Sequence, residues 1–224
     1  MKTITVLIAE DHAVVRGGLR ALLTAEADIQ VIGEAENGRQ AVTMTNKLRP
    51  DVVVMDIAMP LLNGLEATRQ ILKSAPDTKV LMLSAHNDDE YVEQTMAWGA
   101  AGYLVKQSSA HLLSKAIRDV HAGKTVYSAS ISRRLLDRQD KRRTKGALQL
   151  RNGGMSSREL EVLQLVAEGM ANKQVASELA ISIKTVEKHR QNLMRKLGIH
   201  DTAGLTRYAI SAGIIESAVK LTIE

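Results

Sequence analysis

Short apolar runs alternate with amphipathic stretches over the first 124 residues. Two of the runs, VVVM at 52–55 and VLML at 80–83, are continuously apolar, as strands buried on both faces are. We expect strands at residues 4–9, 30–33, 52–56, 80–84 and 102–105. Helices are expected between them at residues 14–25, 39–48, 64–74, 89–98 and 110–122. Five such repeats predict an α/β fold with a doubly wound, five-stranded parallel sheet.

The pattern changes near Tyr127. Ser, Arg, Lys, Asp and Gly dominate as far as Gly154, and only residues 131–136 could form a helix, which is typical of a linker. Beyond it, helices are expected at residues 157–168, 172–179, 183–197 and 202–212. A chain of 224 residues is long enough for two cores. We therefore divide it into an α/β domain at 1–124, a basic linker at 125–154 and an all-α, four-helix domain at 155–224.

Charge is divided unevenly between the two halves. Residues 1–124 carry 13 Lys and Arg against 15 Asp and Glu, whereas residues 125–224 carry 17 against 10. Residues 133–151 alone hold eight basic and two acidic side chains. This asymmetry indicates that only the second half meets a polyanion, although a basic run is also typical of a solvated linker.

The composition indicates the cell compartment in which the protein works. The chain has no cysteine, which excludes disulfides and thiolate metal sites and fits a reducing cytoplasm. No stretch approaches the roughly 20 apolar residues of a membrane span. We expect a soluble cytoplasmic protein without a membrane partner.

Polar side chains follow the predicted strands. Glu10 and Asp11 follow the first strand, Asp56 ends the third, Ser84 ends the fourth, and Lys106 follows the fifth. In such sheets the site lies beyond the carboxyl ends of the strands, so we expect these five side chains to converge. Three close carboxylates require a cation, and oxygen ligands suit Mg²⁺. Asp56 could then attack a phosphoryl group, with Lys106 and Ser84 contacting its oxygens.

A single acid at a strand end is more often a solvated loop residue, but these residues lie in segments that resemble a known domain. The segments are EDH at 10–12, MDIAMPLLNG at 55–64, LSAH at 83–86 and GAAGYLVK at 99–106. Together they resemble the receiver domain of two-component response regulators, across residues 1–124. The resemblance implies that Asp56 accepts phosphate from a histidine kinase. It also implies that Glu10, Asp11 and the backbone carbonyl of Ala58 help Asp56 to bind Mg²⁺.

The same resemblance implies a phosphate-sensing set. Ser84 and Lys106 would sense the phosphate, and Tyr103 would be the aromatic switch. The alternative for Tyr103 is a half-buried aromatic at a sheet edge. Pro60 and Gly64 fit the loop after the phosphorylation site, because Pro fixes φ and Gly permits a tight turn.

Residues 172–197 have the pattern of a helix-turn-helix. A short helix is followed by a tight connection at 180–182, and Ser182 is a good N-cap for the longer helix that begins at Ile183. One face of that helix is charged and amide-rich, with Lys184, Glu187, Lys188, Gln191 and Arg195. The arrangement fits a DNA major groove, although many helical hairpins also have a charged outer face.

The amino-acid sequence of this region favours a DNA-binding helix over an ordinary helical hairpin. MSSRELEVLQLVAEGMANKQVASELAISIKTVEKHRQNLMRKLGIHD at 155–201 resembles the LuxR-type, GerE-like DNA-binding domain. The whole chain resembles the NarL/FixJ class of response regulators, which also begin with the pattern formed by Glu10, Asp11, His12, Arg16, Gly18 and Leu19. The resemblance implies that residues 183–197 are the recognition helix and that residues 202–212 pair with their twin in a DNA-bound dimer. The phosphorylated homodimer would bind double-stranded promoter DNA and regulate transcription.

We expect the DNA contacts to divide by chemistry. The residues that can reach base edges are Lys184, Lys188 and Gln191, since Gln suits adenine and Lys suits guanine. The residues better placed for phosphates are Asn172, Lys173, Thr185 and Arg195. Glu187 departs from the lysine often found at this position in such domains. Its carboxylate either accepts a hydrogen bond from a cytosine amino group or orients Lys184 or Lys188.

Two other functions are open at this point. The carboxylate cluster alone would also suit a magnesium phosphohydrolase, which turnover of small phosphoesters would reveal; the attached helix-turn-helix argues against an enzyme. The second alternative function is a DNA-binding protein that ignores phosphate and uses its first domain only for dimerisation. The complete set of Asp11, Asp56, Ser84 and Lys106 argues against that reading.

Overall fold

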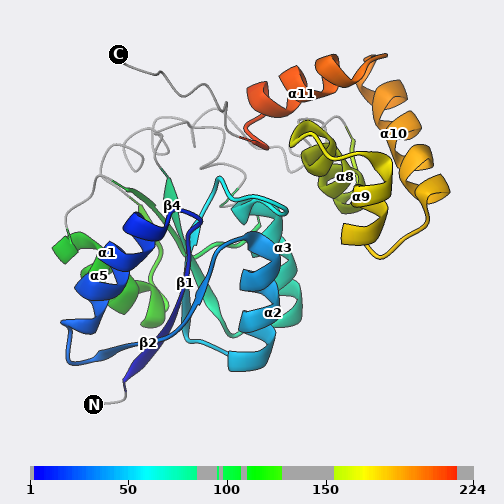
Figure 1. Cartoon of the computed structure of the whole chain (residues 1–224). Coiled ribbons are helices and arrows are strands. Elements are labelled where there is room, and N and C mark those ends of the chain that lie inside the picture. Colours follow the sequence, from blue (N-terminus) through cyan, green and yellow to red (C-terminus); the bar gives the residue numbers. More distant parts are fainter. Residues whose placement is uncertain (1–2, 85–94, 96–97, 107–109, 128–153, 216–224) are drawn as a thin grey trace, which may run out of the picture. The chain divides into compact units, whose positions relative to one another are not determined.

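The computed structural model describes residues 3–84, 95, 98–106, 110–127 and 154–215. The chain divides into two compact units, Met1–Leu148 and Gln149–Glu224 (Figure 1). The helix expected at 131–136 and most of the expected linker lie outside the described residues. Of the helix expected at 89–98, only Thr95 and Trp98 are described. The predicted boundaries at residues 124 and 154 therefore stay predictions.

The first unit is built on a parallel sheet with the strand order β2-β1-β3-β4-β5-β6. Its strands are β1 Ile4–Ala9, β2 Ile29–Ala35, β3 Val52–Asp56, β4 Lys79–Ser84, β5 Gly102–Val105 and β6 Val126–Tyr127. The predicted fold class is confirmed, with one strand more than expected. The additional strand, β6, pairs with Gly102 and Tyr103 of β5. Two residues are too few to show a period, which is why the sequence did not reveal it.

Helices cover both faces of this sheet. The helices are α1 Ala13–Thr24, α2 Gly38–Leu48, α3 Gly64–Ser74 and α5 Ala110–His121. Figure 1 shows α1 and α5 on one face and α2 and α3 on the other. Successive β3 residues alternate between the two apolar cores, with Val53 and Met55 in one and Val52 and Val54 in the other. The continuous apolar runs are therefore explained by strands that bury both faces.

The loop after β3 is held tightly against the strand. The Gly64 amide donates to the Ile57 carbonyl at 2.8 Å, and the Asn63 side chain caps α3 by accepting from the Glu66 amide at 2.9 Å. A side chain at position 64 would collide with the Asp56 carbonyl oxygen. Glycine is thus required by close backbone approach, not by the turn conformation that we expected.

The second unit contains four described helices, as predicted. They are α8 Ser157–Ala167, α9 Asn172–Glu178, α10 Ile183–Leu197 and α11 Thr202–Ser211. The core between them is apolar and includes Val162, Leu163, Val175, Val186, Leu193 and Leu205. Ser182 caps α10 as predicted, accepting from the Thr185 amide at 3.1 Å. Gly198 ends α10 with a left-handed φ of 64°.

An ion pair secures the ends of two of these helices. Lys196, in the last turn of α10, lies 2.6 Å from the Glu159 carboxylate in the first turn of α8. Glu159 also completes the capping box with Ser156.

In the part of the chain described, no helix has the length and apolar character needed to cross a membrane.

Candidate functional site

Acidic side chains meet a lysine at the carboxyl edge of the sheet. Glu10, directly after β1, is fully buried, and Asp56, the last residue of β3, is 3% exposed. The Lys106 Nζ atom, just beyond β5, lies 2.9 Å from Glu10 Oε2 and 2.9 Å from Asp56 Oδ2. The structure therefore brings together three of the five residues that follow the strands, by direct contact.

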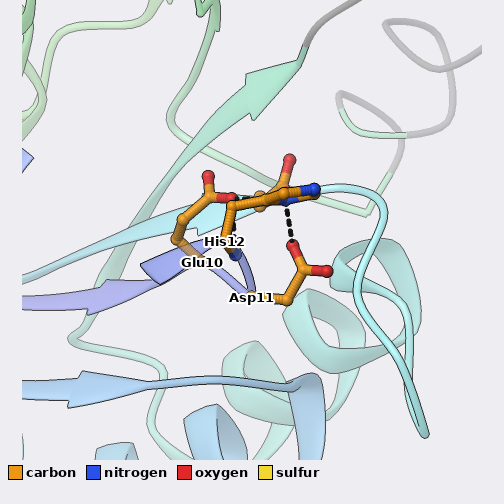
Figure 2. Close-up of side chains that lie close together, drawn as sticks. Glu10, Asp11 and His12 are labelled. Atoms are coloured by element: carbon orange, nitrogen blue, oxygen red, sulfur yellow. Dashed lines mark hydrogen bonds and ion pairs between the residues drawn. The ribbon is translucent and has the colours of Figure 1, made fainter. Parts of the chain in front are cut away.

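Asp11 and His12 complete this cluster (Figure 2). His12 Nδ1 lies 2.8 Å from Asp11 Oδ1 and 3.2 Å from Glu10 Oε1. The ligand atoms of Glu10, Asp11, His12 and Asp56 all lie within 4.8 Å of one another. The expected set of three carboxylates was incomplete, because the side chain of His12, which follows Asp11 directly in the sequence, turns back toward the acids.

The electrostatics of the cluster centre on Asp56. Burial raises the pKa of Asp56 from 3.8 to about 7; the Glu10 charge raises it too, and Lys106 offsets part of the shift. Burial alone would lower the pKa of Lys106, but the Asp56 and Glu10 carboxylates hold it above 10.5. The neighbouring Asp11 carboxylate raises the pKa of His12 above 6.5. Burial and the neighbouring carboxylates thus both favour the protonated form of Asp56.

The buried oxygens fit a hard divalent cation. Among the described residues, the close partners of Glu10 Oε2, Asp11 Oδ1 and Asp56 Oδ2 are the Lys106 ammonium and the His12 ring. These contacts leave carboxylate lone pairs free. Oxygen donors at this spacing suit Mg²⁺ better than a softer metal. Glu10, Asp11 and Asp56 are the residues that could hold it.

Arg16 holds the acidic loop in place, a role that our sequence reasoning missed. Its guanidinium donates to the backbone carbonyls of Glu10 at 2.8 Å and Asp11 at 3.3 Å. It also donates to the Glu36 carboxylate at 2.9 Å and lies 3.5 Å from Glu34. The side chain is mostly buried although it is charged. An arginine six residues after Glu10, within the predicted helix, was the available signal.

The remaining predicted residues of this unit lie around the cluster. Ser84 is buried at the end of β4, and its carbonyl accepts from the Lys106 amide at 2.7 Å. Ala58 is half-buried in the loop after β3. Tyr103 is fully buried in the apolar core, one strand away from Met82. The half-buried edge position considered for Tyr103 is wrong, because β6 covers the outer side of β5.

In the second unit, a groove follows the exposed face of α10. The residues that line it are Asn172, Lys184, Glu187, Lys188, Arg190, Gln191 and Met194. Five of the eight predicted contact residues are among them. Lys173, Thr185 and Arg195 are not; the Thr185 hydroxyl lies 2.8 Å from that of Ser182, within the cap of α10.

Arg190 connects three helices and was not predicted to do so. It donates from α10 to the Asn172 side-chain oxygen at 2.8 Å, at the start of α9, and to the Thr202 hydroxyl at 2.7 Å, at the start of α11. Because the Asn172 oxygen is the acceptor, the amide group of Asn172 keeps its two N–H donors for another partner. The Arg190 guanidinium is thus engaged within the unit, whereas Lys184 and Lys188 are exposed.

Comparisons with known proteins agree with these two units. One family model, the response regulator receiver domain, matches residues 6–118, and another, bacterial regulatory proteins of the luxR family, matches residues 154–209. The transcriptional regulatory protein LiaR of Bacillus subtilis (strain 168) is 39% identical over 92% of this chain and 96% of LiaR. The response regulator protein VraR of Staphylococcus aureus (strain Mu3) is 34% identical over 96% of this chain and all of VraR.

A solved structure covers both units. The RcsB response regulator of Salmonella typhimurium has a TM-score of 0.62 and is 28% identical, covering 95% of this chain and 99% of RcsB. A receiver domain and a LuxR-type helix-turn-helix in one chain define a DNA-binding transcription regulator. The chain belongs to the response regulators of two-component systems, as its resemblance to the NarL/FixJ class implied.

The raised pKa of Asp56 predicts a pH-dependent effect of Asp56→Asn on stability. The folded state keeps a proton that the unfolded state has lost, so the free energy of unfolding of the wild type falls as pH rises from about 4 to about 7. An amide cannot ionise. In EDTA, Asp56→Asn should therefore match the wild type near pH 4 and exceed it by about 2–4 kcal/mol above pH 7.

Denaturant unfolding followed by Trp98 fluorescence measures this difference, because the only tryptophan packs against the receiver core. Asp77→Asn, at an exposed position, is the matched control and should show no such rise. A difference independent of pH for Asp56→Asn would contradict the assignment of the shifted group.

Proposed function

We propose that Asp56 is the phosphoacceptor of this response regulator and that its phosphodonor is a histidine kinase. The observation that carries the proposal is the burial of the Asp56 carboxylate against Lys106 and Glu10, at the sheet edge where ligands bind in such folds. Mg²⁺ would be held by Glu10, Asp11, Asp56 and the backbone carbonyl of Ala58. Bound there, it would supply positive charge to the oxygens of the incoming phosphoryl group.

The chemistry assigns a role to each side chain. A carboxylate oxygen of Asp56 forms the new bond to phosphorus, while the phosphorus–nitrogen bond to the kinase histidine breaks and its electron pair stays on the imidazole. Lys106 then pairs with the phosphoryl group, and the Ser84 hydroxyl donates to one of its oxygens. The phosphoryl group ends on this chain, so turnover of other phosphoesters is not its function.

We propose that Lys106, Ser84 and Tyr103 carry the signal away from the site. A phosphoryl oxygen competes with Glu10 for the Lys106 ammonium, so the contacts of Lys106 differ between the unphosphorylated and the phosphorylated state. Ser84 lies on the neighbouring strand and follows Lys106 through their backbone hydrogen bond. Tyr103, buried three residues before Lys106, changes its packing as β5 adjusts.

We propose that the phosphorylated chain binds double-stranded promoter DNA as a homodimer through α10, with α11 facing its twin. The exposed basic and amide groups along the α10 groove support this proposal. Support also comes from a structure of two RcsB dimers bound to two parallel DNAs, which matches 94% of this chain with a TM-score of 0.59. A protein that acts on promoter DNA would work in the cytoplasm, and this location is part of the proposal.

The phosphoacceptor proposal predicts one modified residue. Incubation with acetyl phosphate and Mg²⁺ should add a single phosphoryl group to the intact mass, and EDTA should prevent it. Asp56→Asn should abolish the addition, whereas the exposed control Asp77→Asn should leave it unchanged. A phosphoryl group still gained by Asp56→Asn would show that the acceptor is another residue.

The DNA proposal predicts two different responses to substitution in α10. Gln191→Ala and Lys188→Ala should each weaken specific binding by about 1–3 kcal/mol and non-specific binding much less. Arg195→Ala should weaken all sequences alike and make the salt dependence shallower by about one unit. Titration of labelled specific and random duplexes at several salt concentrations measures both. Equal losses on the two duplexes for Gln191→Ala would remove its base-reading role.

A further inference from the structure

Glu187 is an exposed carboxylate in the middle of the basic face of α10. It lines the groove together with Lys184, Lys188 and Gln191, which lie within about one turn of it on the helix. A negative charge at this place repels DNA phosphates and weakens binding to any sequence. Some favourable contact must therefore offset the cost when the helix enters a major groove.

Among the described residues of the second unit, no ion pair or hydrogen bond accounts for the charge of Glu187. In the part of the second unit that is described, Glu187 forms neither an ion pair nor a hydrogen bond with Lys184 or Lys188. Arg190, three residues further along the helix, would be its natural partner. The Arg190 guanidinium instead donates to Asn172 and Thr202. The expectation that Glu187 orients a neighbouring lysine thus has no support in the structure.

The hydrogen-bonding groups of the base edges leave one base as the partner of the Glu187 carboxylate. An ionised carboxylate only accepts hydrogen bonds. In the major groove, guanine presents the acceptors O6 and N7, and thymine presents the acceptor O4. Adenine offers its N6 amino group beside the acceptor N7, whereas cytosine offers its N4 amino group with no acceptor on the same base edge. Cytosine is the base that satisfies this carboxylate without repulsion.

We propose that Glu187 reads a cytosine amino group in each half-site of the bound DNA. It sets specificity by attraction to cytosine and by repulsion of the acceptor edges of guanine and thymine. The proposal rests on the DNA-binding function proposed above and adds the base that this position selects.

In vitro selection tests it with the full-length chain, activated by beryllofluoride and Mg²⁺, on a library of randomised duplexes. The variants are Glu187→Gln, which keeps the shape and removes the charge, and the control Glu168→Gln. Glu168 is an exposed glutamate at the end of α8, outside the α10 groove. Its substitution by glutamine therefore removes the same charge from the same domain. Selected duplexes are then titrated with each of the four bases at the position that changes.

The wild type and Glu168→Gln should enrich cytosine at one position of each half-site. Glu187→Gln should select adenine there instead, since glutamine pairs with adenine, and the other positions should not change. The ratio of affinities for the cytosine and adenine duplexes should fall by roughly 5- to 150-fold in Glu187→Gln.

Two outcomes overturn the proposal and are distinguishable. Enrichment of a defined sequence that is the same for the wild type and Glu187→Gln would refute the role of Glu187 and leave the DNA-binding function intact. Enrichment of no sequence by the wild type would refute the DNA-binding function, and the role of Glu187 with it.

Discussion

The contact of one lysine with two buried carboxylates is the constraint on which the receiver unit depends. Lys106 lies 2.9 Å from both Glu10 and Asp56, and these three residues come from three different strand ends. Burial raises the pKa of Asp56 to about 7, and the Glu10 and Asp11 charges, which a single ammonium cannot neutralise, add to the shift. Excess negative charge in a buried site is a free-energy cost in the absence of a ligand. In the proposed function, this cost is also what allows a cation, and then a phosphoryl group, to shift the conformation of the unit.

The surrounding structure keeps these charges together. Arg16 binds the backbone carbonyls of Glu10 and Asp11, so the acids cannot move apart to relieve their repulsion. On the other side, Gly64 allows the loop after β3 to close onto the Asp56 carbonyl. The second unit has a similar arrangement, because Arg190 ties the start of α9 and the start of α11 to α10. In both units an arginine fixes backbone or side-chain groups next to the candidate functional residues.

Much of this was predictable from the sequence. Runs such as VVVM revealed strands buried on both faces, and parallel strands place their polar ends at one edge, so the convergence of Glu10, Asp56 and Lys106 followed. Contacts that depend on side-chain conformation did not follow. The turn of His12 back toward Asp11 and the two arginine bridges need three-dimensional positions, and β6 is too short to carry a period. Because β6 was not predicted, one of the two interpretations of Tyr103 placed it wrongly at a half-buried sheet edge.

Mg²⁺ binding coupled to proton release tests the central electrostatic claim most directly. Isothermal titration calorimetry at pH 7, in buffers of different ionisation enthalpy, reports how many protons leave when the cation binds. We expect one Mg²⁺ per chain and roughly half a proton released, since Asp56 has a pKa of about 7 and a metal ligand must be deprotonated. Asp56→Asn should release fewer protons than the wild type, since only the His12 imidazole beside Asp11 is then left to lose one, and Asp11→Asn should bind at least about tenfold more weakly. Binding by Asp11→Asn with unchanged affinity, or binding by the wild type without proton release, would contradict a cation site built on these buried carboxylates.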